Sequence, residues 1–349
     1  MTLTCLISFI PPLLSGLLLM LLFFPPADRA AAGLLFRLFA GGGLGIGVTS
    51  CLYFIALLTG LADYYPAFDL GLCLLLGAIL FFQAKKKGLR REGSFPESRT
   101  SLEAGKSGGK GARTDPAVSL PGSPVQQILT AVLFAAALLC SLISFIIAYW
   151  KEPHGRWDAW LIWNMHARFL FRGGDLWREA FASGLDWSHW DYPLLLPLSI
   201  ARGWTYGGES VWLPAGLAFV FTFLTLGLLG SSLALLRDGI RGCLGGMLLM
   251  GTPLFIIMGA SQFADMPLAL FILTTLVLLF IAMKDQGRSG SRDHHPGIVV
   301  LAGLAAGLCA WTKNEGLLFL MIAAGCFFCA TAWAQGWKSA LSRIAWFFA

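Results

Sequence analysis

Long apolar runs, separated by short polar breaks, make up most of this chain of 349 residues. Many of these runs approach the ~20 residues that an α-helix needs to cross a bilayer. They predict membrane spans at about 3–24, 33–61, 68–82, 128–149, 211–236, 243–258, 267–283, 298–311 and 316–333. We therefore expect an all-α, polytopic transmembrane helix bundle with about 8–10 spans.

Composition and the glycines inside the apolar runs both indicate a membrane bundle. Hydrophobic residues make up 57% of the chain and charged residues 13%, and the mean hydropathy is +0.72. A soluble domain would carry roughly twice this charged fraction. The glycine cluster GGGLGIG at 41–47 could cradle a phosphate, but no Lys-Ser or Lys-Thr follows it and its surroundings are apolar. We interpret it as a site of close helix packing, because small residues let two backbones approach.

The positive charge of the chain is concentrated between residues 84 and 127. This segment holds nine basic and four acidic residues, so it supplies five of the six net positive charges. Binding of a nucleic acid would call for interleaved aromatic rings, and the segment contains only Phe95. We expect no nucleic-acid partner and interpret the segment as a disordered cytoplasmic loop that obeys the positive-inside rule. It divides the chain into N-terminal spans at 1–83 and a transmembrane core at 128–349.

The stretch at 150–192 is dense in charge and aromatic rings. It holds seven of the 13 tryptophans and three of the five histidines, with five basic and six acidic residues. If the basic loop is cytoplasmic, the span before this stretch delivers it to the extracytoplasmic face, where tryptophans suit the membrane interface. Residues 157–172 are predicted to form an interfacial amphipathic helix, with Asn164 and Arg168 on one stripe. Asp158 lies in its first turn, where an acid can simply cap a helix.

The membrane topology depends on the segment from Pro193 to Tyr206, which is short and broken for a span. If this segment is re-entrant or interfacial, the positive-inside rule places the basic turns after the later spans in the cytoplasm. Asp265 and the break at 313–315 then lie outside, near the Trp-rich stretch. If the segment crosses the membrane, the later topology inverts.

Several polar side chains near span ends could carry chemistry. Asp265 lies at the mouth of a span, where an acid is costly unless it is solvated or paired, so it is a candidate functional residue. Lys313 and Glu315 lie between two apolar runs, where they could neutralise one another or the lysine could offer a point charge to a phosphate. His189 and Asp191 could bind a divalent metal ion, although H-x-D spacing is common and polar decoration at headgroup level is an alternative.

Four motifs, in this order, resemble the GT-C superfamily of membrane glycosyltransferases, which includes protein O-mannosyltransferases and lipid A aminoarabinose transferases. They are the loop acid in RWDAW, the YPLLLP segment, the span mouth ADMPLALF and the small-residue helix GLAAGLCAWTKNEGLLFL, and they cover about residues 150–320. The chain departs from the better-known members because three spans precede its loop helix. It also stops at Ala349 inside an apolar run, so we expect the sequence to be truncated there.

The resemblance implies transfer of a sugar from a polyprenyl-phosphate donor to a hydroxyl of a glycan, lipid or protein acceptor on the extracytoplasmic face. Asp158, at the position of the family's loop acid, would act as general base, and attack at the anomeric carbon would invert the configuration. A cation would stabilise the leaving phosphate, supplied by a side chain or by a metal ion. The substrate-binding candidates are Trp157, Trp160, Arg168, His189, Asp191, Tyr192, Asp265, Lys313 and Glu315.

Two alternatives stay open from the sequence. Trp157 and Trp160 could stack on a sugar or could equally anchor the loop in the interface. The main rival to an enzyme is a transporter or flippase of a lipid-linked or small solute, with Asp265 and residues 313–315 along its pathway. Transport predicts charge buried in mid-span, whereas this chain concentrates charge at span ends. From the resemblance and the lack of targeting motifs we expect a multi-pass protein of the inner membrane, with membrane lipid as a partner.

Overall fold

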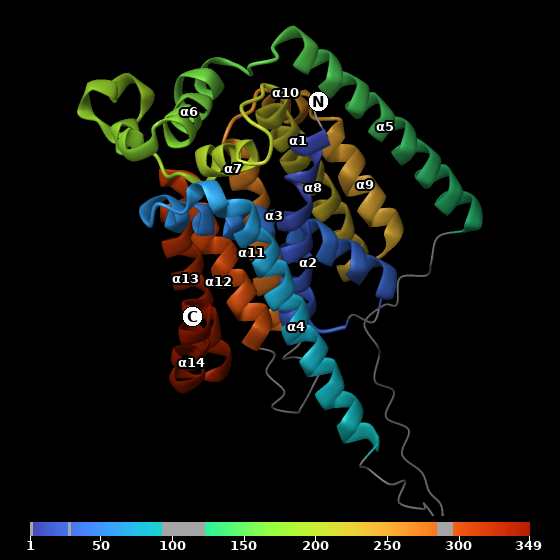
Figure 1. Ribbon diagram of the computed structural model, residues 1–349. Coiled ribbons are helices and arrows are strands. Elements are labelled where there is room, and N and C mark those ends of the chain that lie inside the picture. Colours follow the sequence, from blue (N-terminus) through green and yellow to red (C-terminus); the bar gives the residue numbers. More distant parts are fainter. Residues whose placement is uncertain (1–2, 27–28, 93–122, 285–295) are drawn as a thin grey trace, which may run out of the picture.

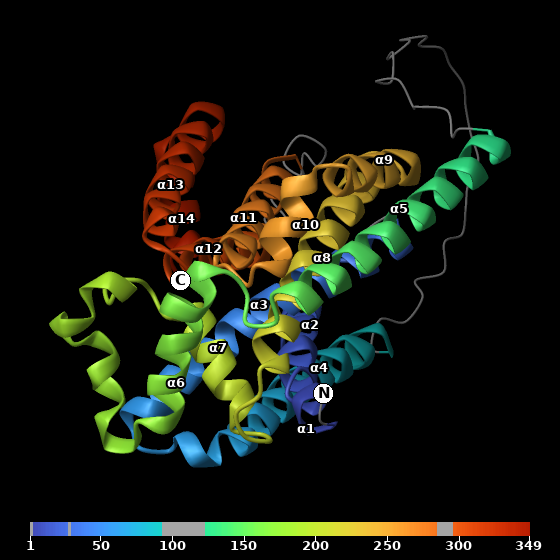
Figure 2. The same ribbon diagram turned by 90° about the horizontal axis from the view of Figure 1, so that it is seen from above.

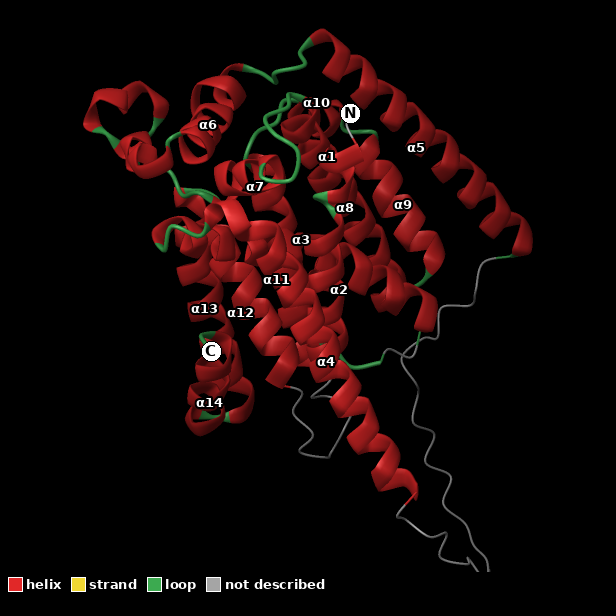
Figure 3. Ribbon diagram, viewed as in Figure 1, coloured by secondary structure: helices red, strands yellow, loops and turns green. Residues whose placement is uncertain are grey.

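The computed structural model describes residues 3–26, 29–92, 123–284 and 296–349. Helices joined by turns make up this part of the chain, and no strand occurs within it, so the all-α class is confirmed (Figure 3). The α-helices are α1 (Leu3–Ile7), α2 (Ile10–Phe23), α3 (Ala30–Leu58), α4 (Tyr65–Glu92), α5 (Pro124–Lys151), α6 (Asn164–Arg172), α7 (Leu195–Trp204), α8 (Trp212–Leu236), α9 (Gly239–Met250), α10 (Pro253–Ala260), α11 (Asp265–Lys284), α12 (Pro296–Ala310), α13 (Asn314–Gln335) and α14 (Trp337–Phe347). Short 3-10 helices lie at Ala62–Tyr64, Gly174–Phe181 and Ser183–Ser188.

Seven helical segments of the described chain are long and apolar enough to cross a membrane: α1 with α2, then α3, α4, α5, α8, α11 and α13. α9 and α10 meet at a bend of 70° and make an eighth if they form one broken span. α12 is apolar but has only 15 residues, about 22 Å of helix. The chain is therefore a multi-pass membrane protein. Its described residues hold seven such spans, fewer than the predicted 8–10, or eight with the bent pair, because the runs at 243–258 and 298–311 form a broken pair and a short helix.

α2 and α3 lie side by side through the middle of the bundle (Figure 1). Their contact leaves no room for side chains at Gly16, Gly41 and Gly45. A Cβ atom at Gly45 would overlap the carbonyl oxygen of Pro12, and one at Gly16 would overlap the carbonyl oxygen of Gly41. The interpretation of the glycine cluster as a helix-packing site is therefore confirmed.

The two ends of the bundle carry different elements. In Figure 1, α6, α7 and α10 lie at one end, here called the loop end, and α14 and the C-terminal half of α4 lie toward the other, here called the basic end. Three arginines donate hydrogen bonds to carbonyl groups at the C-terminal ends of α8, α2 and α11, where the helix dipole favours a cation. They are Arg29, Arg37 and Arg343. These helix ends point away from the loop end, as the positive-inside pattern predicts.

The segment from Pro193 to Tyr206 does not cross the bundle. Its helix, α7, has ten residues, all of them buried, and is about 15 Å long. The Leu195 amide donates to the Trp311 carbonyl oxygen at 3.0 Å, which ties the start of α7 to the break between α12 and α13. α8 then begins at the loop end (Figure 1), which favours the re-entrant or interfacial arrangement over the inverted one.

The segments before and after α5 agree in part with the sequence-based predictions. The predicted helix over 157–172 is present, as a π-helical turn at Ala159–Trp163 that continues into α6. Seen from above, the 3-10 helices after α6 lie on the side of the bundle opposite α5 (Figure 2). Both ends of the expected loop at 84–127 are helical: α4 continues to Glu92, and α5 begins at Pro124. The rest of that loop lies outside the described residues.

Candidate functional site

Lys313 is the centre of a charged cluster at the loop end. Its Nζ lies 3.3 Å from Asp265 Oδ1 and 3.5 Å from Glu315 Oε1. The lysine side chain is 14% exposed, whereas the two carboxylate side chains are 49% and 61% exposed. Burial acts against the charge of Lys313, but Asp265 and Glu315 outweigh it and hold the lysine pKa above its usual value. The site therefore presents a largely buried, protonated ammonium group with two exposed carboxylate partners.

The end of the Trp-rich stretch meets this cluster from the other side. Asn314 Nδ2 donates to Asp191 Oδ2 at 3.0 Å. The next residue, Tyr192, has its ring stacked between Trp163, at 5.4 Å between centroids, and His189, at 4.7 Å. Asp191 and Tyr192 are thus fixed against the first residue of α13, one position after the lysine.

The pKa of Tyr192 depends on burial and on several nearby charges. Burial raises the pKa of its phenol above the usual value, Lys313 acts against this rise, and Glu315, Asp191 and Asp158 act with it. The phenol is consequently neutral at physiological pH and can donate a hydrogen bond to a substrate oxygen. Asp158 has the weakest effect of these charges, so the loop acid lies within electrostatic reach of the tyrosine.

Asp158 is half-buried in the first turn of the loop helix. Its carboxylate makes no capping hydrogen bond, so the structure does not support a simple capping role. Within the described residues this carboxylate has no hydrogen-bond or ion-pair partner.

A clamp of backbone and amide groups holds the loop helix next to the start of α11. The Arg156 amide donates to the Ser261 carbonyl oxygen at 3.2 Å. Gln262 accepts from Asn164 Nδ2 at 3.2 Å and donates through Nε2 to the Pro153 carbonyl oxygen at 3.0 Å. Gln262 has a φ of +61°, a left-handed conformation that costs energy in a residue with a side chain. This clamp joins the segment before Asp158 to the segment before Asp265.

Arg168 and the two tryptophans of the loop helix are not part of the lysine cluster. Arg168 Nε donates to Glu209 at 2.8 Å, and Arg172 binds the same carboxylate. Burial would raise the pKa of Glu209, but the two arginines outweigh it and lower that pKa. Trp157 and Trp160 are exposed and lie edge to face, 5.2 Å apart. Their proposed contacts with a sugar stay predictions.

His189 and Asp191, predicted as metal ligands, have no third candidate ligand beside them among the described residues. His189 stacks on a tyrosine ring, and Asp191 binds an asparagine amide. In the part of the chain that the structure describes, no three His, Cys, Asp or Glu residues are grouped so that they could hold a metal ion. These two side chains alone do not make a metal site.

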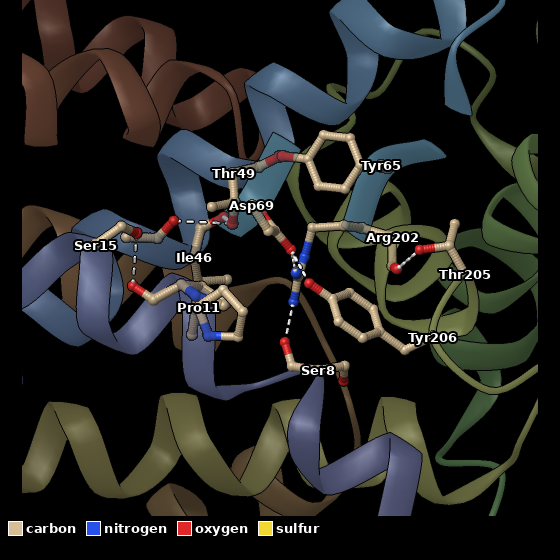
Figure 4. Close-up of polar contacts among 12 residues, drawn as sticks. Ser8, Pro11, Ser15, Ile46, Thr49, Tyr65, Asp69, Arg202, Thr205 and Tyr206 are labelled. Carbon is tan, nitrogen blue, oxygen red and sulfur yellow. Dashed lines mark hydrogen bonds and ion pairs between the residues drawn. The ribbon is translucent and has the colours of Figure 1, made fainter. Parts of the chain in front are cut away.

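Sequence reasoning missed a second charged group, an ion pair between Asp69 on α4 and Arg202 on α7 (Figure 4). The Asp69 side chain is 0% exposed and that of Arg202 4%. Tyr206 donates its hydroxyl to Asp69 at 2.6 Å, and Arg202 Nη2 donates to the Ser8 carbonyl oxygen at 2.6 Å. The signal in the sequence is one acid and one base, each within an apolar run, where a charge implies a partner or a function.

Comparison with known proteins gives no match. No protein-family model matches the chain, and neither a curated protein nor a solved structure is detectably similar to it. The site itself offers three groups at one end of an apolar bundle. They are the unpartnered carboxylate of Asp158, the neutral phenol of Tyr192 and the largely buried ammonium group of Lys313.

Proposed function

We propose that this chain is a membrane glycosyltransferase that moves a hexosyl or pentosyl group from a polyprenyl-phosphate donor to an acceptor hydroxyl. The observation that carries the proposal is the gathering of Asp158, Tyr192, Asp265 and Lys313 at the loop end. The resemblance to the GT-C superfamily assigns sugar transfer to the same motifs. The loop end would face away from the cytoplasm, because the helix-capping arginines point the other way.

The proposed reaction is a single displacement. Asp158 takes the proton of the acceptor hydroxyl, whose oxygen attacks the anomeric carbon. The bond from that carbon to the phosphate oxygen breaks, the configuration inverts, and the lipid phosphate leaves with the electron pair. The unpartnered carboxylate of Asp158 supports its role as base, because no donor or cation of the described chain lowers its basicity.

Lys313 suits the leaving phosphate. An ammonium group in a partly dry site stabilises negative charge that develops in the transition state more strongly than it would in water. The phosphate must displace Asp265 or Glu315 from the lysine, and both carboxylates are exposed enough to turn into solvent. The lipid tail of the donor would lie among the spans, which gives a sugar transferase a reason to be built as a membrane bundle.

A transporter or flippase is the second candidate, and the buried Asp69–Arg202 pair favours it. Charges inside a membrane bundle often mark a transport pathway. Here, however, the two charges neutralise one another. Asp69 is also the fifth of 28 residues in α4, close to the loop end and away from the middle of the span. The enzyme therefore stays the first candidate.

Sugar transfer in membranes tests the proposal. Wild type, Asp158→Asn and the control Asp175→Asn, a change at another acid of the same loop, are compared with radiolabelled polyprenyl-phosphate sugars. Removal of a general base should lower transfer about 100- to 10,000-fold in Asp158→Asn alone, with expression unchanged.

Equal transfer by Asp158→Asn and wild type would show that another group is the base. If wild type consumes no donor from a broad panel but moves a lipid-linked solute across proteoliposomes, the chain is a transporter and the enzyme proposal is wrong.

A further inference from the structure

The buried ion pair joins three parts of the fold that are far apart in the sequence. Asp69 comes from α4, Arg202 and Tyr206 come from α7 and the turn after it, and the Ser8 carbonyl oxygen lies between α1 and α2 (Figure 4). The guanidinium group of Arg202 therefore binds two separate elements at once. A planar fork of donors can do this, whereas the single ammonium group of a lysine cannot hold both in the same geometry.

The sequence explains why an acceptor is available at Ser8. Proline has no amide hydrogen, so Pro12 cannot donate to the carbonyl oxygen four residues earlier. The Ser8 carbonyl oxygen is thereby left open where α1 gives way to α2, inside the apolar part of the bundle. An unmet backbone acceptor there is costly, and Arg202 meets it.

The pair is poorly explained as a source of stability. Taking two charges out of water costs about as much as their attraction returns, and an apolar pair of similar size is often as stable. Asp69 Oδ1 and Arg202 Nε have no hydrogen-bond partner within the described residues, so even this network is incomplete. The best-attested use of such a buried polar group is to fix register between helices.

α7 is the element whose register the pair controls. Arg202 holds its C-terminal end, and the bond from Leu195 to Trp311 holds its start. Asp191 and Tyr192 lie just before that start, and Asp191 accepts a hydrogen bond from Asn314, the residue after Lys313. A ten-residue helix is stiff, so a displacement at Arg202 moves the other end of α7 as well.

We propose that Asp69 and Arg202 are positioning residues that fix the depth of the re-entrant helix α7 and thereby hold Asp191 and Tyr192 against the start of α13. The inference rests on the same site as the proposed function. Its first readout needs no substrate, so the two can fail separately.

A disulfide reporter at the site end of α7 tests the inference. The side chains of Asp191 and Asn314 touch, so the yield of a disulfide between Asp191→Cys and Asn314→Cys under mild oxidation reports how closely the two segments approach. The yield is measured as the loss of two maleimide-PEG tags. The parent chain, with its eight native cysteines, sets the background. The reporter is then combined with Asp69→Leu/Arg202→Met, which replaces both charges by apolar groups and should still fold.

Disulfide formation should fall about tenfold in the combined variant when it is measured well below the variant's Tm. That Tm should lie below the parent's, because the Ser8 carbonyl oxygen and the Tyr206 hydroxyl lose their partners. A matched control removes the exposed ion pair Asp238–Arg241 and should leave the reporter unchanged. If the apolar variant folds and forms the disulfide as efficiently as the parent, the inference is wrong. If it does not fold, Arg202→Lys replaces it, and unchanged disulfide formation in that variant overturns the inference as well.

Sugar transfer supplies the second readout. If wild type transfers sugar, loss of register should raise the KM for the acceptor in the apolar variant and leave its expression unchanged. If wild type transfers no sugar but the disulfide result holds, the positioning role stands and the proposed function falls.

Discussion

Acid should open the loop helix α6 through His166. This imidazole is fully buried, with Nε2 at 3.1 Å from Ser188 Oγ and no partner for Nδ1 within the described residues. Protonation would add a second N–H donor in a place without an acceptor. Burial accordingly lowers the pKa of His166 from 6.5 to about 4. The neutral ring is therefore part of how the Trp-rich stretch packs at neutral pH.

The size and the sign of the effect follow from this difference in pKa. The opened loop, with its ordinary histidine pKa, takes up a proton first as the pH falls, so acid favours the opened state. The stabilisation is complete above about pH 6.5 and is lost as the pH falls toward about 4. A difference of about 2.5 pH units corresponds to about 3 kcal/mol.

Hydrogen exchange of α6, corrected for the intrinsic pH dependence of exchange, measures this free energy of opening. Between about pH 7.5 and about pH 4.5, wild type should lose about 2 to 3 kcal/mol more than His166→Gln, which cannot be protonated. His154→Gln removes an exposed histidine of the same loop and should behave as wild type. If wild type and His166→Gln lose protection in parallel, carboxylates rather than His166 govern the acid response.

Two further changes test packing and positioning. Gly45→Ala should lower stability by about 2 kcal/mol, because its methyl group overlaps the backbone of α2. Gly77→Ala on α4, with nothing within 4 Å, should be neutral or slightly stabilising, and equal melting temperatures of the two variants would contradict this account. Gln262→Gly should relieve about 1 kcal/mol of backbone strain yet lower sugar transfer, because the clamp beside Asp158 is lost. Transfer at the wild-type rate by this variant would show that the clamp does not position the base.

Most of the spans, and the end of the bundle that Asp265 and Lys313 share, could be predicted from the sequence. An apolar run of about 20 residues has few other stable structures. Alternation of basic and neutral connections then places Asp265 and Lys313 at the same end. Their contact follows easily, because α11 and α12 are consecutive and adjacent helices. The same reasoning gave the role of the glycine cluster, since small residues in a span serve close packing.

Contacts between distant segments could not be predicted in this way. Asp69 and Arg202 are 133 positions apart, and their pairing depends on how deeply α7 enters the bundle. Arg168 lies on the predicted stripe, but nothing near it in the sequence identifies Glu209 as its partner. The left-handed backbone of Gln262 is set by its two amide bonds rather than by its own preference. Each of these features requires the packed structure.

The two charged groups of this protein differ in a way that separates chemistry from positioning. A group that exchanges partners during a reaction must be reachable, as Asp265 and Glu315 are on either side of Lys313. A group that fixes geometry works best when nothing can displace its partner, and the side chains of Asp69 and Arg202 are buried. Loss of one exposed carboxylate should therefore change a rate before it changes the melting temperature. Loss of one member of the buried pair leaves an uncompensated charge, which costs about 3 to 5 kcal/mol and should reduce folding first.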